Sequence, residues 1–216
     1  MNDEKPVRAD ALRNRRAILE AASQLFAERG LTVSLDEIAR HAGLGVGTVY
    51  RRFGTRDAIV EALFATRIEH IAQVAHDCLD NPDPRLGLIE FLRASCADLA
   101  GDRGLRQVVI GLSQGTEAIQ RTRATLEPAM SALVERAHTA GALRPGLAPT
   151  DVPMLFMMIG MVGDLVGTSF PDAWERYFEL VLTGILSPDA PAPTQPALTA
   201  EQFDAAMTDW LPSQRT

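Results

Sequence analysis

The stretch of residues 34–53 constrains the fold of this chain more than any other part of it. Ser34 is followed three residues later by Glu37, a spacing that is typical of a capping box at the start of a helix. In a capping box the two residues satisfy backbone N–H groups that the first helical turn leaves unpaired. The sequence therefore predicts a short helix that begins at Ser34. The apolar residues that share one face of this helix are Leu35, Ile38 and Ala39.

Ala42-Gly43-Leu44-Gly45 ends this helix, because two glycines spaced by one residue permit a sharp turn with positive φ. A second short helix follows, with its apolar residues at helical spacing: Val46, Val49 and Phe53. The opposite face of this second helix presents Gly47, Thr48 and Arg51, with Tyr50 at the flank. Two short helices joined by a tight turn predict a helix-turn-helix, and the second helix suits the major groove of DNA.

Each residue on that face has a chemical reason to meet DNA. Gly47 has no side chain to hold the backbone away from the duplex. Thr48 offers a hydroxyl and a methyl group, and Arg51 is long enough to donate two hydrogen bonds to a guanine. Tyr50 is better placed for a phosphate than for a base edge. The alternative is that Tyr50, Arg51 and Arg52 form an ordinary solvated helix face, but the capping box, the glycine turn and the apolar spacing all favour DNA binding.

The chain resembles the TetR family of transcriptional regulators. The family signature is a helix ending in F-x-x-x-G, a T/S-x-x-x-I-A helix, the run A-G-V-S-x-G-T-x-Y-x-x-F, and a basic residue that opens a long helix. The chain matches it at residues 26–30, 34–39, 42–43, 47–50, 53 and 56. Gly45 stands where the family usually has a serine, so the side-chain cap of the second helix is missing. Glycine in place of serine at an N-cap lowers helix stability by only a few tenths of a kcal/mol. We expect the following DNA-binding residues: Ser34, Gly45, Gly47, Thr48, Tyr50, Arg51, Arg52 and Arg56.

The charge of the chain is divided unevenly along its length. The net charge is -7, but residues 1–56 hold ten Lys and Arg against seven Asp and Glu, a balance of +3. The remaining residues hold eleven against twenty-one, a balance of -10. This asymmetry indicates a small basic module that binds nucleic acid and is attached to an acidic body. The acidic body would repel DNA and so orient the approach of the protein to DNA.

The composition predicts an all-α protein of 216 residues with three parts. Residues 1–56 form the helix-turn-helix domain, residues 57–186 form a larger ligand-binding and dimerisation domain, and residues 187–216 form a Pro/Ala-rich linker with a short helix. We expect helices near residues 10–29, 56–78, 85–100, 103–111, 114–140, 152–168, 172–186 and 199–211, with a kink or break near Leu126 because Pro128 follows it. No apolar run is long enough to span a membrane, so we expect a soluble, cytoplasmic protein. Cys78 and Cys96 lack C-x-x-C spacing and are expected to be buried thiols and not a disulfide or a metal site.

The helix predicted at residues 152–168 is apolar on every side except at Asp164. Such a helix has to be buried all round, so we expect one face on the subunit's own core and the other on a twin subunit. In the family the last two helices of this domain form a four-helix dimer bundle, which the resemblance implies here. The residues expected at the dimer interface are Gly160, Gly163, Gly167, Tyr177, Phe178 and Val181.

Three classes of function can be compared at this point. The leading one is a homodimeric repressor that binds a palindromic double-stranded DNA operator and is released by a small-molecule effector. A ligand-independent activator or architectural protein is the alternative, and an enzyme is disfavoured because no histidine stands beside a nucleophile, zinc or phosphate-loop signature. We expect no cofactor or metal. An apolar effector pocket is expected from Phe91, Met130, Met157, Met161, Asp164 and Trp174, although most of these residues also suit ordinary core or dimer packing.

Overall fold

The computed structural model describes residues 4–101, 117–167 and 169–210, and all the regular structure in these ranges is helical. The all-α fold predicted from the sequence is therefore confirmed for the described part of the chain. The expected helix at residues 103–111 lies outside the described residues. None of the helices in the described ranges is long and apolar enough to cross a membrane.

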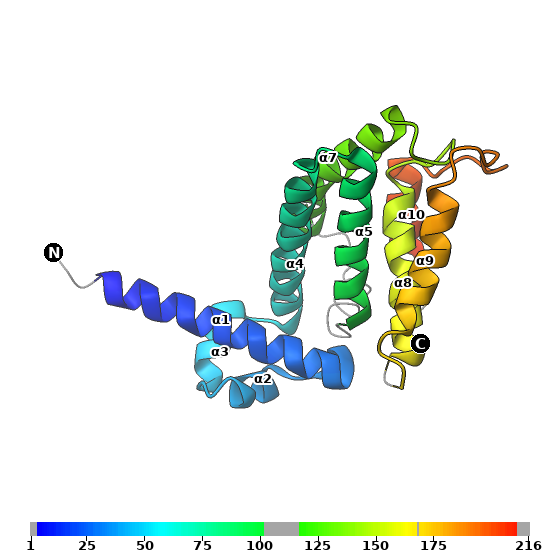
Figure 1. Ribbon diagram of the computed structural model, residues 1–216. Coiled ribbons are helices and arrows are strands. Elements are labelled where there is room, and N and C mark those ends of the chain that lie inside the picture. Colours follow the sequence, from blue (N-terminus) through cyan, green and yellow to red (C-terminus); the bar gives the residue numbers. More distant parts are fainter. Residues whose placement is uncertain (1–3, 102–116, 168, 211–216) are drawn as a thin grey trace.

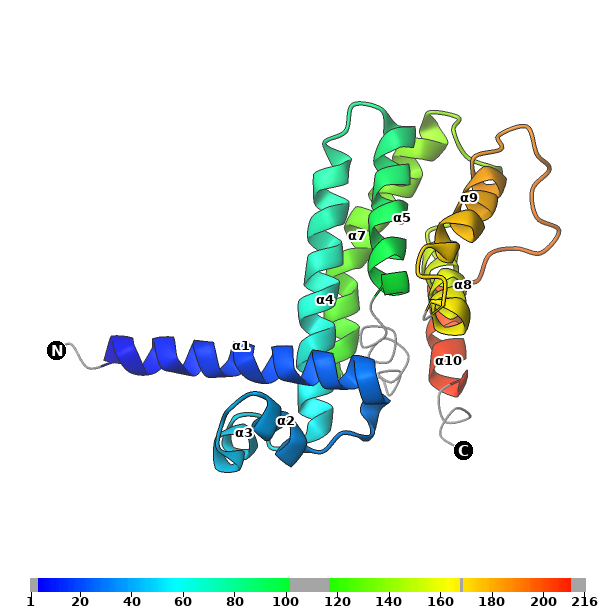
Figure 2. The ribbon, with the colours of Figure 1, turned by 60° about the horizontal axis from the view of Figure 1, so that its bottom comes forward.

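The N-terminal unit consists of three helices and one short 3-10 turn. They are α1 (Glu4–Arg29), η1 (Gly30–Thr32), α2 (Leu35–His41) and α3 (Val46–Phe53). α1 lies across the lower end of the molecule, with α2 and α3 beneath it (Figure 1). It begins one and a half turns before the expected start at Asp10, because Pro6 falls in the first turn, where its missing N–H costs no hydrogen bond. Leu12, expected in the apolar stripe of α1, is 69% exposed because the first half of the helix extends beyond its neighbours (Figure 2).

The larger unit is built on three long helices. They are α4 (Arg56–Leu79), α5 (Pro84–Gly101) and α7 (Glu117–Thr139). α4 packs extensively on α7, and α5 packs on α4 and α7. α7 continues through Pro128 without a break. The remaining helices are α8 (Asp151–Val166), α9 (Ala173–Ile185) and α10 (Ala200–Trp210).

α5 lies at the centre of the larger unit. It contacts α4 and α7 on one side and α8 and α9 on the other, and Figure 1 shows α4, α5 and the α8–α9 pair side by side in that order. One continuous hydrophobic core joins all of these helices to α1, α2 and α3. α4 belongs to both units, since it packs on α1 and α3, which lie at its lower end in Figure 2, and also packs on α5 and α7.

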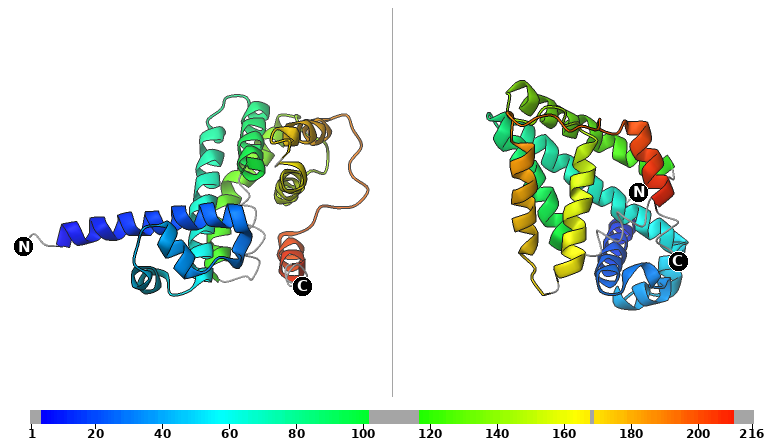
Figure 3. Two further views of the ribbon diagram at one scale, coloured as in Figure 1. Left: turned by 90° about the horizontal axis from the view of Figure 1, so that it is seen from below. Right: turned by 90° about the vertical axis from the view of Figure 1, so that its right-hand side faces the viewer.

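The tail leaves α9 as an extended linker and returns to the body of the protein. Arg144 Nε donates a 2.8 Å hydrogen bond to the carbonyl oxygen of Pro191, and the hydroxyl of Thr150 donates one of 2.7 Å to that of Leu198. The linker then leads to α10, which lies beyond the α8–α9 pair (Figure 3). α10 starts with a second capping box, between Thr199 and Gln202.

Candidate nucleic-acid interface

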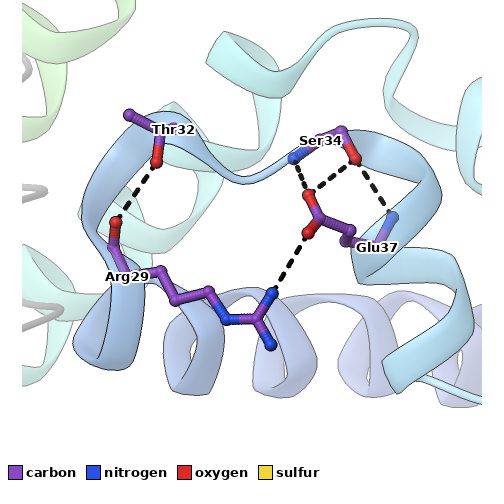
Figure 4. Close-up of polar contacts among 4 residues, drawn as sticks. All are labelled: Arg29, Thr32, Ser34 and Glu37. Carbon is purple, nitrogen blue, oxygen red and sulfur yellow. Dashed lines mark hydrogen bonds and ion pairs between the residues drawn. The ribbon is translucent and has the colours of Figure 1, made fainter.

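The predicted capping box at the start of α2 is present. The backbone N–H of Ser34 donates to Glu37 Oε2 at 2.9 Å, and the backbone N–H of Glu37 donates to Ser34 Oγ at 3.3 Å (Figure 4). Arg29 Nη1 donates to the other carboxylate oxygen of Glu37 at 3.1 Å, which joins the end of α1 to the start of α2. The hydrogen bonds from the Ser34 backbone and side chain, aided by the charge of Arg29, hold the pKa of Glu37 below its ordinary value.

The turn between α2 and α3 depends on one of its two glycines for its left-handed conformation. Gly43 has a φ of 66°, whereas Gly45 has a φ of -65° and an extended backbone. The expected positive φ is therefore confirmed at Gly43 only. Gly45 is the N-cap of α3, and no side chain caps the helix there. A Cβ atom on Gly45 would meet only the Thr48 hydroxyl, at 4.0 Å, so a side chain would fit at this position.

The outer face of α3 is open to solvent. Val49 is fully buried and anchors the helix, whereas Tyr50 and Arg51 are exposed. Thr48 is half-buried. A Cβ atom built on Gly47 would meet no heavy atom within 4 Å, so the α3 backbone has free space in front of it at this residue. Gly47, Tyr50 and Arg51 thus lie together on a surface to which another molecule has access.

Two of the expected DNA-binding arginines hold parts of the protein together. Arg52 Nη2 donates a hydrogen bond to the carbonyl oxygen of Ala11 on α1. Arg56 Nη1 donates to the carbonyl oxygen of Leu31 at 2.6 Å, and its Nη2 lies 3.3 Å from the carboxylate of Asp57. Both guanidinium groups remain exposed, so these contacts fix their position without removing their charge from the surface.

Further contacts hold α1 against the helix-turn-helix. His41 Nε2 lies 2.8 Å from Gln24 Oε1, and the guanidinium of Arg15 lies over the ring of Phe53, 5.8 Å from its centroid. Sequence reasoning does not predict these contacts, because they depend on how the helices cross. They give the second helix of the motif a defined position relative to α1.

The residues expected in the effector pocket occupy different environments. Phe91, Met130 and Trp174 are buried, Met157 is half-buried, and Met161 and Asp164 are exposed. These six residues thus do not share one environment, and their grouping around an effector stays a prediction. A surface pocket in the described part of the chain lies elsewhere, where α5 begins and α7 ends, and is lined by Pro84, Ala132, Glu135, Arg136, Thr139 and Ala140.

The residues expected at the dimer interface also divide into two groups. Gly160, Gly163 and Phe178 are buried within the subunit, whereas Gly167 and Val181 are half-buried and Tyr177 is 46% exposed. The sequence does not tell which side of the apolar helix α8 faces outward. That outward side, together with the adjoining side of α9, is a surface we call the α8–α9 apolar face. Its exposed large residues are Met154, Met158, Met161, Leu165, Tyr177 and Leu180.

Both cysteines are free and buried, as the sequence predicts. Burial of Cys96 raises the pKa of its thiol to about 12, and burial also raises the pKa of Cys78. These thiols therefore stay protonated near neutral pH, which suits a packing role and not a reactive one.

Two parts of the chain are similar to known protein families. Residues 18–63 match the bacterial regulatory proteins of the TetR family, and residues 83–187 match the C-terminal domain of SbtR-like transcriptional regulators. The mycofactocin biosynthesis transcriptional regulator MftR of Mycobacterium tuberculosis, whose assignment to that role is itself provisional, is 42% identical over 79 residues. These residues are 36% of this chain, and the chain spans 38% of the length of that relative.

Solved structures extend the similarity over both units. The transcriptional regulator FadR of Bacillus subtilis, solved in complex with stearoyl-CoA, shares the fold with a TM-score of 0.62 at 19% identity, over 79% of this chain and 98% of that one. A TetR regulatory protein from Mycobacterium vanbaalenii is 32% identical, with a TM-score of 0.59, over 84% of this chain and 100% of that one. Because this relative is matched along its whole length and the family signature falls on α2 and α3, the chain belongs to the TetR family of transcriptional regulators.

Proposed function

We propose that the protein is a homodimeric transcriptional repressor that binds a palindromic DNA operator and releases it when a small molecule binds the larger unit. This role would place it in the cytoplasm with the DNA that it controls. The observation that carries the proposal is the open face of α3, where the free space at Gly47 adjoins the exposed side chains of Tyr50 and Arg51.

The chemistry of that face suits the major groove. Gly47 allows the α3 backbone to approach the bases, and Arg51 can donate two hydrogen bonds to a guanine. Tyr50, Arg52 and Arg56 suit phosphates, whose role is to position the protein and not to read the sequence. Arg52 and Arg56 are already held by internal hydrogen bonds, so little side-chain freedom would be lost when they meet the backbone of DNA.

The α8–α9 apolar face supports a homodimer. Leu165 on α8 is 83% exposed and Leu180 on α9 is 60% exposed, and these two helices pack on each other. Several exposed apolar side chains on two neighbouring helices are typical of a protein interface. A two-fold dimer would place two α3 helices about 34 Å apart, one turn of DNA, and so match a palindromic site.

The position of α4 supports release by an effector. The helix packs on α1 and α3 of the N-terminal unit and on α5 and α7 of the larger unit, so a change around α5 can alter the spacing of the two α3 helices. A ligand that binds one spacing better than the other shifts the population by its difference in affinity. FadR, which shares this fold, was solved with stearoyl-CoA bound, which favours an apolar or amphipathic effector for this chain.

A ligand-independent activator or architectural protein is the second candidate. It is favoured by the different environments of the six expected residues, of which Met161 and Asp164 are exposed. The two functions differ in one observable property, since only the first requires a compound that releases DNA.

The decisive experiment selects DNA from a random pool with the purified protein and then screens small molecules for release. The proposal expects a palindromic consensus with half-sites about one helical turn apart, and at least one compound that lowers affinity for it. Sequences without two-fold symmetry would contradict the homodimer. A tight palindrome that no compound releases would favour the ligand-independent alternative.

A further inference from the structure

Two buried polar atoms of the larger unit have no hydrogen-bond partner. They are the hydroxyl of Ser95 on α5 and Nε of Arg67 on α4, and no other buried side-chain nitrogen or oxygen atom in the described ranges is in this condition. Ser95 is only 2% exposed, so water does not reach it freely. Buried polar groups in folded proteins nearly always have partners, and an exception needs an explanation.

The hydroxyl of Ser95 differs from other helical hydroxyls of the chain. A serine or threonine within a helix commonly donates to the carbonyl oxygen four residues before it. Thr66, Thr139 and Thr183 do so, at distances of 2.8 to 3.0 Å, and Ser187, two residues after the end of α9, makes the same bond at 2.6 Å. These four residues could use water instead, since they are exposed or half-buried. Ser95 cannot, yet its hydroxyl does not bond to its own helix.

The carboxylate of Asp98, on the same helix as Ser95, contacts Arg67. Arg67 Nη2 lies 3.4 Å from Asp98 Oδ2, and His70 Nε2 lies 3.5 Å from the same oxygen. Asp98 follows Ser95 by three residues on α5, so the two side chains are neighbours on the helix surface. Asp98 thus holds one end of the Arg67 guanidinium, while Nε stays available beside α5.

The surroundings of Ser95 on α5 are apolar. Phe91 and Leu99, one turn to either side of it, are both buried. The ring of Phe91 meets that of Phe156 on α8 edge to face, with 5.9 Å between the centroids. α5 therefore offers two unpaired polar groups at the border of an apolar interior, an arrangement typical of a site for a molecule with one polar end.

We propose that Ser95 Oγ and Arg67 Nε bind the carboxylate end of an effector whose apolar body lies among the core residues of α5 and α8. The inference rests on the proposed control by a small molecule. Nε can only donate, and a hydroxyl can donate, so the two groups together suit an acceptor with two oxygens. An ammonium group has only donors, so it would offer no acceptor to Nε. Since Arg67 is on α4, the carboxylate would bind directly to the helix that joins the two units.

The test measures binding of octanoate and dodecanoate to the full chain by titration calorimetry, with octylamine and dodecylamine as probes of opposite charge. The carboxylates are expected to bind in a saturable manner and the amines are not. Ser95→Ala and Arg67→Lys should each weaken carboxylate binding at least tenfold, since the first removes the hydroxyl and the second keeps the charge but removes Nε. Ser187→Ala, in which a hydroxyl with an internal partner is lost, should leave binding unchanged.

Thermal unfolding without any probe supplies a second measurement. Because the Ser95 hydroxyl has no partner to lose, Ser95→Ala should keep or raise the melting temperature. A clear fall would mean that the hydroxyl is already satisfied, and would overturn the proposal. Failure of both carboxylates to bind, or equal binding to wild type and Ser95→Ala, would overturn it as well.

Operator binding separates this inference from the proposed function. If carboxylates bind through Ser95 and leave the DNA complex intact, the carboxylate site stands and release by this ligand class is wrong. If the carboxylates do not bind while another compound releases the operator, the proposed function stands and the Ser95–Arg67 site is wrong.

Discussion

The guanidinium of Arg56 donates a 2.6 Å hydrogen bond to the carbonyl oxygen of Leu31. This contact joins the first turn of α4 to the 3-10 turn that leads into α2. Thr55 caps the same turn of α4 by accepting a hydrogen bond from the N–H of Ala58 at 3.1 Å. The start of α4 is thereby fixed to the helix-turn-helix by a side chain that the family signature marks only as basic.

Replacing Arg56 should weaken the connection between the two units. We expect Arg56→Met to lower the free energy of unfolding by about 1 kcal/mol, the usual value of a partly exposed hydrogen bond, as measured by urea denaturation. Arg85→Met is the matched control, since Arg85 is an exposed arginine in the first turn of α5. An equal effect in the two variants would contradict a structural role for Arg56.

Arg51 and Tyr50 should affect DNA binding in different ways. Arg51→Ala is expected to weaken operator binding by about 1–3 kcal/mol and to relax the preference at one base pair in each half-site. Tyr50→Phe should weaken binding to all sequences alike, because the hydroxyl is assigned to a phosphate. Binding titrations against a set of single-base operator variants distinguish these effects, and an unchanged base preference in Arg51→Ala would rule out its role in reading bases.

Leu165 provides a direct test of the dimer. Because its side chain is 83% exposed on the α8–α9 apolar face, Leu165→Arg should leave the subunit folded and place a charge in the proposed interface. Analytical ultracentrifugation should show monomers at micromolar concentration, with reduced operator affinity. Leu86→Arg, at an exposed leucine of α5, should remain dimeric, and a monomeric wild type would refute the interface.

Acid should weaken the capping box through Glu37. The folded-state pKa of Glu37 is lower than its ordinary value of 4.5, so its contribution to stability is complete above that pH and is lost as the pH falls through the folded-state pKa. Glu37→Gln keeps an oxygen that can accept from the Ser34 N–H but does not titrate in this range. The melting temperature of the wild type should therefore fall more steeply than that of the variant between neutral pH and pH values below 4.5, and parallel curves would show that Glu37 is not responsible.

Local sequence signals predict the start of α2 and the break before α5 well. Ser34 and Glu37 satisfy each other within four residues, so their geometry does not depend on the rest of the fold. Pro82 and Pro84 act in the same local way, because a proline restricts its own backbone and that of the residue before it. α5 accordingly begins at Pro84.

The sequence is less informative where long-range packing determines the position of a helix or the partner of a side chain. α8 is apolar on nearly all sides, so its periodicity cannot show which side faces the subunit's own core. Gly160 and Gly163, which are expected at the dimer interface, are both buried within the subunit. The partners of Arg52 and Arg56 are likewise backbone oxygens 41 and 25 residues away, which no local pattern indicates.

The hydrophobic core runs without interruption from Ile18 of α1 to Ile185 of α9, and α4 lies in both halves of it. A chain with such a core melts as one cooperative unit, so the DNA-reading helices cannot stay folded once the larger half has opened. Substitutions that abolish DNA binding should therefore occur throughout the sequence, and many of them will be temperature-sensitive changes in the interior of α5 or α7. In a genetic screen these variants would have the same phenotype as variants that lack Arg51. Lowering the growth temperature would restore DNA binding in the temperature-sensitive variants but not in those that lack Arg51.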